Sequence, residues 1–271
     1  MQSKANTVLN RHAGLAGLRR SLFNPVRLYL GFLLLGMLCV AFLPMAFAMF
    51  VFFSRAQGRR ACRAAISSAF RFYLRSLELM GACRFDLTEL DTLRGGPAMI
   101  IAPNHPCLLD AVMILSRLPD AACIMKADIV NSVFFGAGAR LAGYIRNSPL
   151  RTMIQLAVAD LHQGSHLLLF PEGTRTRRFP VGAMQGTAGL IAKHASVPVQ
   201  TVFIETDSGF LGKGWSLFWT PKLPITYRIR LGKRFEPPRY AANFASELEL
   251  YFLIELANAQ LPGFPVSAPP T

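Results

Sequence analysis

The sequence predicts an α/β fold, a layered sheet with flanking helices, preceded by an N-terminal apolar segment that inserts in a membrane. Residues 28–53 form a run of 26 residues without a charge. From Pro97 onward, short apolar runs typical of buried strands alternate with helical patterns. The chain has 271 residues, 52% of them hydrophobic and 16% charged, so it can bury one sizeable core and is not disordered.

The first 77 residues are basic as well as apolar. They contain eleven Lys and Arg residues, and the first acidic residue is Glu78. A basic segment can bind nucleic acid or an anionic lipid surface. About 20 apolar residues suffice to cross a bilayer. The run at 28–53 therefore favours membrane lipid as the partner, and no nucleic acid is expected.

The flanks of the apolar run leave its orientation open. Five basic residues precede it and six follow it, so the positive-inside rule does not choose a side. Pro44 lies inside the run, which allows a kinked span or a re-entrant hairpin within residues 28–53. Residues 46–48 (Ala-Phe-Ala) also fit a signal-peptide cleavage site, although the long segment before the run disfavours cleavage.

After this run, residues 59–80 predict an amphipathic helix that packs on the core, lies on anionic lipid, or does both. Strands are then expected at 98–102, 122–125, 166–170, 199–204 and 225–231, and helices at 106–117, 149–163 and 184–195. This alternation favours α/β layers. Functional residues in such folds commonly lie where strands end.

A histidine and a carboxylate follow the first of these strands. The segment reads Asn104-His105-Pro106-Cys107-Leu108-Leu109-Asp110. Five helical steps would put His105 and Asp110 on different faces, so they meet only if His105 lies outside the helix and Asp110 in its first turn. Pro106 suits the first helical position. The pair then has the arrangement of a general base with its orienting carboxylate, although a lone His-x4-Asp is also compatible with a structural histidine.

A second motif follows the strand at 166–170. It reads Phe170-Pro171-Glu172-Gly173-Thr174-Arg175. Gly173 lets the backbone approach a ligand closely, and Arg175 can bind phosphate oxygens in a fork. Glu172 could order the arginine or bind a glycerol hydroxyl. The alternative is a solvated basic loop.

Together the two motifs resemble the paired signatures of the glycerolipid acyltransferases, N-H-x4-D and F-P-E-G-T-R. Two weaker segments agree: residues 126–129 (Lys-Ala-Asp-Ile) are similar to the family's K-x-[DE]-L, and residues 197–199 (Val-Pro-Val) to its V-P-[IV]. The resemblance covers roughly residues 97–205. In two places the chain departs from the family: residues 143–147 (Gly-Tyr-Ile-Arg-Asn) lack the aspartate that normally precedes the arginine, and Cys107 stands where many members have serine.

The resemblance implies a reaction. His105, oriented by Asp110, would deprotonate the hydroxyl of a lysophospholipid such as 1-acyl-glycerol-3-phosphate, which attacks the thioester of acyl-CoA or acyl carrier protein. The residues expected to bind the acceptor are Lys126, Arg146, Glu172, Gly173, Thr174 and Arg175. No metal or redox cofactor and no acyl-enzyme are implied.

The implied organisation is a membrane-anchoring leader at 1–80, an acyltransferase domain at 81–262 and a flexible tail at 263–271. Five cysteines without a C-x-x-C pair indicate a reduced domain facing the cytoplasm, at the inner membrane. His162 and His166 lie four apart, but the Gly-Ser turn between them favours a structural role over a metal site.

Three alternatives are kept. The first is an acyltransferase for another lipid acceptor in a specialised pathway. The second is a thioesterase or transferase that uses Cys107 together with His105. The third is a membrane adaptor without activity, which would leave both motifs unexplained. The chain contains no G-x-S-x-G and no complete nucleotide-binding glycine motif, which disfavours a serine hydrolase and a nucleotide-binding protein.

Overall fold

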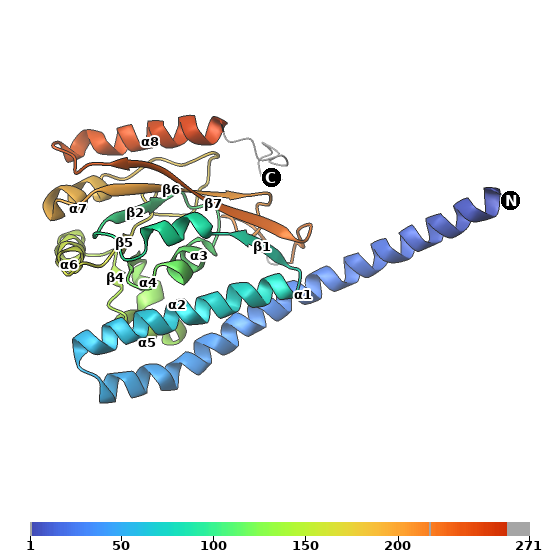
Figure 1. The fold of residues 1–271 in the computed structure, drawn as a ribbon, viewed down its shortest axis with the longest axis horizontal. Coiled ribbons are helices and arrows are strands. Elements are labelled where there is room, and N and C mark those ends of the chain that lie inside the picture. The colour runs from blue at the N-terminus through green and yellow to red at the C-terminus, as the bar shows by residue number, and fades with distance from the viewer. Residues whose placement is uncertain (1, 217, 259–271) are drawn as a thin grey trace.

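A seven-stranded sheet forms the centre of the molecule (Figure 1). The computed structural model describes residues 2–216 and 218–258, and the side chains of all of these except residues 2–23, 133–135 and 258. The strands are β1 (Cys83–Asp86), β2 (Ile100–Pro103), β3 (Ala122–Met125), β4 (Ile145–Arg146), β5 (Leu167–Leu168), β6 (Val199–Thr206) and β7 (Ile225–Phe235). They lie in the order β1-β7-β6-β2-β5-β3-β4, and every neighbouring pair is parallel except β6 and β7. The predicted α/β fold is confirmed.

Helices cover both faces of this sheet. They are α1 (Gln2–Phe52), α2 (Arg55–Leu79), the 3₁₀ helix η1 (Thr88–Leu93), α3 (Asp110–Arg117), α4 (Ala127–Asn131), α5 (Val133–Leu141), α6 (Leu150–His162), α7 (Thr187–Ala195) and α8 (Ala241–Asn258). Figure 1 shows α7 and α8 on one side of the sheet and α1 and α2 on the other. Each side has its own core, and neighbouring residues of β2 alternate between them: Ile101 faces α2 and α3, whereas Ile100 faces α6 and α7. Strands buried on both faces read as continuous apolar runs, which is why these strands were predictable.

The topology brings four loops to one edge of the sheet. Strands β2, β3, β5 and β6 are mutually parallel, so the loops that follow them leave the sheet at the same edge. From β2 the chain crosses to β3 through α3, and from β5 it crosses to β6 through α7. The neighbours β2 and β5 therefore mark the point where the strand order reverses, which is where α/β folds commonly bind ligands.

The helices α1 and α2 form a helical hairpin beside the sheet. Helix α1 continues through Pro44 to Phe52, and the chain reverses after it, at Phe53 and Ser54. The alternative of a re-entrant hairpin within residues 28–53 is therefore wrong. Ser54 begins α2, because its side chain accepts a hydrogen bond from the backbone of Gln57. Residues 24–52 form a helix long and apolar enough to cross a membrane.

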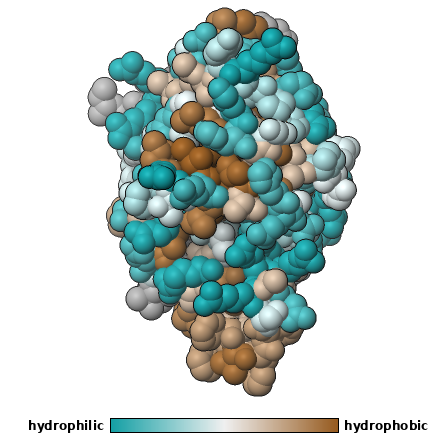
Figure 2. All heavy atoms as spheres, turned by 90° about the vertical axis from the view of Figure 1, so that its left-hand side faces the viewer, coloured by the Kyte–Doolittle hydropathy of each residue, from teal (hydrophilic) through white to brown (hydrophobic). Residues whose placement is uncertain are grey.

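One side of α1 packs on the rest of the chain and the other side is exposed. The packed side chains recur every three or four residues: Leu28, Phe32, Leu35, Leu38, Phe42, Ala46 and Met49. Gly31 allows a close approach to α2, because a Cβ there would lie 2.8 Å from the Leu77 side chain. The exposed apolar residues include Leu33, Met37, Val40, Phe47, Phe50 and Phe52. Brown spheres gather at the bottom of Figure 2, where α1 and α2 meet.

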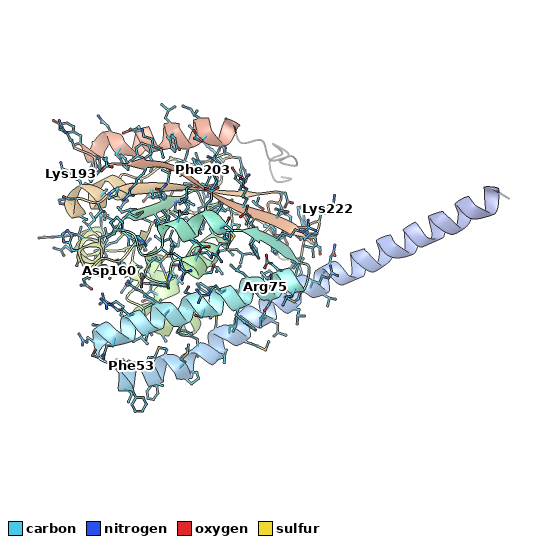
Figure 3. All side chains as sticks on the ribbon, in the orientation of Figure 1. Phe53, Arg75, Asp160, Lys193, Phe203 and Lys222 are labelled. Atoms are coloured by element: carbon cyan, nitrogen blue, oxygen red, sulfur yellow. The ribbon has the colours of Figure 1, made fainter. Side chains whose placement is uncertain are left out.

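Helix α2 packs into the core, which is one of the two roles predicted for residues 59–80. Its residues Ile66, Tyr73 and Leu77 are buried. Arg63 is also buried, and its Nη2 lies 3.0 Å from Oδ2 of Asp160 on α6. Figure 3 labels Asp160. Side-chain packing thus continues across the predicted boundary at residue 80, and that boundary stays a prediction.

All eight strands and helices predicted beyond residue 97 are present, with ends shifted by a few residues. The strands β1 and β4 and the helices α4, α5 and α8 were not predicted. Helix α8 could have been predicted from its sequence, because the buried residues Phe244, Leu248 and Phe252 recur every four residues. The predicted flexible tail lies outside the described residues.

Candidate active site

A histidine and an aspartate meet at the carboxyl end of β2. His105 lies in the loop after the strand, and Asp110 is the first residue of α3. The His105 Nδ1 and Asp110 Oδ2 atoms are 2.7 Å apart. The Asp110 side chain is fully buried, whereas that of His105 is 17% exposed. Because Nδ1 faces the carboxylate, Nε2 is the ring nitrogen that a substrate can meet.

Asp110 also shapes the loop before it. Its Oδ2 accepts a hydrogen bond from the Cys107 backbone N–H at 2.8 Å, and its Oδ1 accepts one from the Cys107 thiol at 2.9 Å. Such local bonds replace the helical pattern, so α3 begins at Asp110. The prediction that Pro106 begins the helix is therefore wrong, and the predicted place of Asp110 in the first turn is confirmed.

Cys107 is held as a buried thiol. The residue is 1% exposed. Burial, followed by the negative charge of Asp110, raises the pKa of the Cys107 thiol well above its ordinary value. A thiol becomes a good nucleophile only as the thiolate. This environment disfavours the alternative in which Cys107 attacks the donor.

Contacts from the second motif fix the position of His105. Its ring stacks on Phe170, with the ring centroids 3.8 Å apart. Its backbone N–H donates to Oε1 of Glu172 at 3.1 Å, and its carbonyl accepts from the backbone N–H of Thr176 at 2.8 Å. The loops after β2 and β5 are therefore bound to each other, and the structure brings the two predicted motifs together.

Glu172 and Gly173 order the loop after β5. Glu172 is buried, and besides His105 it accepts hydrogen bonds from the Thr176 hydroxyl at 2.7 Å and from the Gly182 backbone at 2.8 Å. With three donors, its carboxylate is largely used within the protein. Gly173 has a φ of +65°, and a Cβ there would lie 2.3 Å from the Gln185 side chain. The turn therefore requires glycine.

Arg175 holds a loop that no sequence motif marked. Its Nη1 donates to the carbonyls of Leu211, at 2.8 Å, and Gly212, at 3.0 Å, in the loop between β6 and β7 (residues 207–224). The Leu211 carbonyl also accepts from the Leu108 backbone at 3.3 Å. Leu211 has a φ of +59°, a left-handed conformation that is unfavourable for a residue with a side chain. The β6–β7 loop thus lies against both motifs.

Four cations gather beside this loop: Lys126, Arg175, Arg177 and Lys213. The Lys213 ammonium donates to the Thr174 hydroxyl at 2.9 Å. Desolvation, followed by the positive charges of Arg177, Lys126 and Arg175, lowers the pKa of Lys213. Among the described residues, none of the four forms a salt bridge. We call these four residues the cation cluster, and its unbalanced charge suits an anion such as phosphate.

Arg146 lies at the end of β4, outside this cluster. It is exposed, and the pairing of β3 with β4 places it opposite Met125, the residue before Lys126. Within the described chain, no hydrogen bond or salt bridge joins it to Arg175 or Lys213. Sequence reasoning therefore proposed Arg146 and missed Lys213, which stands alone between two glycines and belongs to no motif.

The two histidines considered as metal ligands bind backbone carbonyls instead. His162 lies 3.3 Å from the Ala195 carbonyl, and His166 lies 3.0 Å from the Leu93 carbonyl. In residues 2–216 and 218–258, no group of three or more His, Cys, Asp or Glu side chains is arranged to hold a metal ion.

Comparisons with known proteins agree with the fold and the motifs. A family model described as acyltransferase matches residues 84–205. The chain is 25% identical over 196 residues to a 1-acyl-sn-glycerol-3-phosphate acyltransferase of Pseudomonas aeruginosa, which covers 67% of this chain and 72% of that protein. Its fold is similar to the crystal structure of the 1-acyl-sn-glycerophosphate (LPA) acyltransferase PlsC from Thermotoga maritima. That likeness has a TM-score of 0.69 at 18% identity and covers 89% of this chain and 99% of the other.

Proposed function

We propose that this chain, which is similar to the glycerolipid acyltransferases in its two motifs and its fold, acylates the free hydroxyl of a lysophospholipid. The acceptor is 1-acyl-glycerol-3-phosphate, the product is phosphatidic acid, and the donor is acyl-CoA or acyl carrier protein. The observation that carries this proposal is the hydrogen-bonded pair of His105 and Asp110 at 2.7 Å. The loop that carries this pair and Arg175 of the cation cluster both bind the Leu211 carbonyl in the β6–β7 loop. The relative from Pseudomonas aeruginosa is named for the same type of acceptor.

In this mechanism His105 is the general base. Its Nε2 takes the proton of the acceptor hydroxyl while the hydroxyl oxygen attacks the thioester carbonyl. Asp110 holds the Nδ1–H and stabilises the imidazolium that forms. The tetrahedral intermediate then expels the thiolate, which takes the proton from Nε2. The new ester and the free thiol leave, and His105 returns to its starting form without an acyl-enzyme.

The cation cluster would hold the acceptor's phosphate. Arg175 uses only its Nη1 to bind the two carbonyls, which leaves its other guanidinium nitrogens available to bind an anion together with Lys213 and Lys126. Charge-assisted hydrogen bonds of this kind are stronger than neutral ones. Glu172 and Gly173 contribute by fixing the loop, Thr174 by holding Lys213, and Arg146 by adding positive charge at the edge of the sheet.

We place the reaction at a membrane, with the site on the cytoplasmic side of the inner membrane. The apolar helix at 24–52 supports membrane attachment. All five cysteines are free thiols, which suits a reducing compartment.

The acceptor is tested by product analysis. The purified full chain is incubated with acyl-CoA or acyl carrier protein and a panel of lysolipids, and products are identified by mass spectrometry. The panel contains 1-acyl-glycerol-3-phosphate and the matched monoacylglycerol that lacks the phosphate. We expect phosphatidic acid from the first and little diacylglycerol from the second. A preference for an acceptor without an exposed phosphate monoester contradicts the acceptor assignment and leaves the reaction type standing.

The thiol alternative is tested by Cys107→Ser. A serine hydroxyl can still donate to Asp110, so we expect substantial activity to remain. Rates of acyl transfer and the intact protein mass after incubation with donor are measured. Complete loss of activity in the variant, together with an acyl group trapped on Cys107 in the parent protein, would favour the thiol mechanism.

A further inference from the structure

The β6–β7 loop exposes a cluster of aromatic side chains. Phe218 is 87% exposed and Trp219 is 53% exposed. The Trp219 ring lies 6.2 Å from the Trp215 ring, which in turn lies 6.0 Å from the Phe210 ring. The Trp215 indole N–H donates to the Trp219 carbonyl at 3.2 Å. The Trp215 and Trp219 rings therefore contact each other and, through Phe210, the core, and exposed apolar patches can mark interaction sites.

Phe210 connects this cluster to helix α1. Its ring lies 6.1 Å from that of Phe32, on the packed side of the helix. Tyr29 and Leu33, next to Phe32, are exposed on the helix that is long and apolar enough to cross a membrane. Figure 3 labels Lys222, at the end of the molecule where α1 leaves the sheet. Phe210 thus links the aromatic cluster to the packed side of α1, next to exposed residues of the same helix.

The same loop also reaches the candidate active site. The carbonyls of Leu211 and Gly212 bind Arg175, and the next residue, Lys213, belongs to the cation cluster. Within ten residues the chain passes from Phe210, against α1, through the anion-binding groups to the exposed Trp219. The loop lies outside residues 84–205, which match the family model.

We propose that the β6–β7 loop is a second membrane contact, in which Phe218 and Trp219 lie at the boundary between lipid headgroups and acyl chains beside α1. Tryptophan favours this boundary because its ring has a large apolar body and a polar N–H. Lys222 is exposed next to it and suits anionic headgroups. The bilayer is the occupant because Phe218 and Trp219 are exposed on a loop that contacts the apolar helix α1 through Phe210 and Phe32.

This contact has a consequence for the reaction, which rests on the proposed function. A lysolipid in the bilayer would meet Trp219 and Phe218 with its acyl chain and Lys213 with its phosphate, on one loop. The acceptor then reaches His105 without leaving the lipid phase.

Intrinsic fluorescence tests the contact directly, because the two tryptophans of the chain, Trp215 and Trp219, both lie in this loop. The full chain with Trp215→Phe is reconstituted into phosphatidylcholine vesicles containing anionic lipid, with plain or brominated acyl chains. We expect brominated lipid to quench the Trp219 emission and the aqueous quencher acrylamide to have little effect. Unchanged emission with bromine, together with full quenching by acrylamide, overturns the proposal. No turnover is needed, so this result stands apart from the proposed function.

An activity measurement tests the consequence. Phe218→Ser should raise the KM for a long-chain acceptor presented in vesicles by about tenfold, since burial of an aromatic ring is worth at least one such factor. The KM for a short-chain, monomeric acceptor should not change. Tyr240→Ser, at an aromatic residue 76% exposed between β7 and α8, is the matched control and should change neither. An equal rise in the KM of both acceptors means that Phe218 acts inside the site, and that result overturns the proposal.

The fluorescence experiment has a further outcome. Trp219 emission that depends on protein concentration and not on lipid means that a second copy covers the loop, and that result also overturns the proposal.

Discussion

The carboxylate of Asp110 accepts three hydrogen bonds, from the His105 ring, the Cys107 backbone and the Cys107 thiol. The same group therefore orients the imidazole and fixes the loop that carries it. An asparagine at position 110 would place an amide N–H against one of these donors. Either the imidazole tautomer or the conformation of the loop must then change. A substitution at Asp110 therefore cannot separate the orientation of the imidazole from the fixation of the loop.

Removal of the imidazole gives a cleaner result. His105→Ala is expected to lower the rate of acyl transfer by about 10² to 10⁴ fold, which is typical for the loss of a general base. The protein should stay folded and membrane-associated. Asp110→Asn should also be severe, because the imidazole loses its orienting carboxylate. Turnover is measured beside circular dichroism, with His194→Ala at an exposed position of α7 as the control. Near-normal turnover of His105→Ala contradicts the base mechanism.

Arg175 binds the β6–β7 loop, and in the proposed function it also binds the acceptor's phosphate; variants can separate these two roles. Arg175→Lys keeps the charge but loses the planar fork, and it should also weaken the bonds to the β6–β7 loop. Lys213→Ala removes charge from the cluster and leaves those bonds intact. If the cluster holds the acceptor's phosphate, both variants raise the acceptor's KM and leave the donor's KM unchanged. The KM values of acceptor and donor are measured by steady-state kinetics, with each substrate varied in turn.

Other outcomes of this comparison are equally informative. A rise in the donor's KM alone means that the cluster binds the phosphates of CoA. A fall in kcat for Arg175→Lys, with Lys213→Ala unaffected, means that Arg175 acts by holding the loop. Arg151→Ala, at an exposed arginine of α6, is the control for loss of positive charge.

At the scale of elements, the strands and both motifs could be predicted because their signals are local. A strand buried on both faces is a short apolar run, and each motif follows such a run directly. The role of the β6–β7 loop could not be predicted, because Arg175 contacts Leu211 36 residues further along the chain. A contact between residues so far apart in the chain produces no local sequence pattern from which it could be predicted. Strand β4 has two residues, too few for any periodicity.

Helix α2 shows a different limit of sequence reasoning. The arginines among its apolar residues suggested a lipid-facing surface, yet Arg63 is buried. Its Nη2 lies 3.0 Å from Asp160, its Nε donates to the Ala142 carbonyl at 2.7 Å, and its Nη1 donates to the Ser165 hydroxyl at 2.9 Å. A buried charge is tolerated only when it is paired and hydrogen-bonded. Neither the partner nor the burial can be read from α2 alone.

This ion pair predicts a large effect on stability. Asp160→Ala leaves the Arg63 charge buried without its partner, and we expect a loss of about 3–5 kcal/mol in the free energy of unfolding. Arg75→Ala, which breaks an exposed pair with Glu78, should cost less than about 1 kcal/mol. Chemical denaturation of the detergent-solubilised protein compares the two. Similar small losses in both variants contradict the view that α2 is fixed to α6 through Arg63.

At the scale of the whole molecule, α1 has one side that packs on the protein and one apolar side that is exposed. One stripe of the helix packs on α2 and α5, and the opposite stripe is apolar and exposed. The same helix therefore belongs to the fold and offers a surface to lipid. Because the packed stripe includes Phe32, which contacts Phe210, α1 also supports the start of the β6–β7 loop.

The last prediction concerns what holds the protein on the membrane. If the exposed stripe of α1 is inserted, the protein should resist extraction by carbonate and by salt of about 1 M, where the Debye length is only about 3 Å, and should require detergent. Leu33→Asp with Met37→Asp puts two charges on that stripe, each costing about 2.5–3.5 kcal/mol in a membrane helix, and should release the protein. Arg55→Gln with Arg60→Gln removes two exposed charges near the start of α2 and should leave it bound. Fractionation followed by immunoblotting measures all three. Release of the parent protein by salt alone would mean that basic residues rather than the apolar stripe hold it, and the β6–β7 loop would then lose the neighbouring lipid contact on which its proposed role depends.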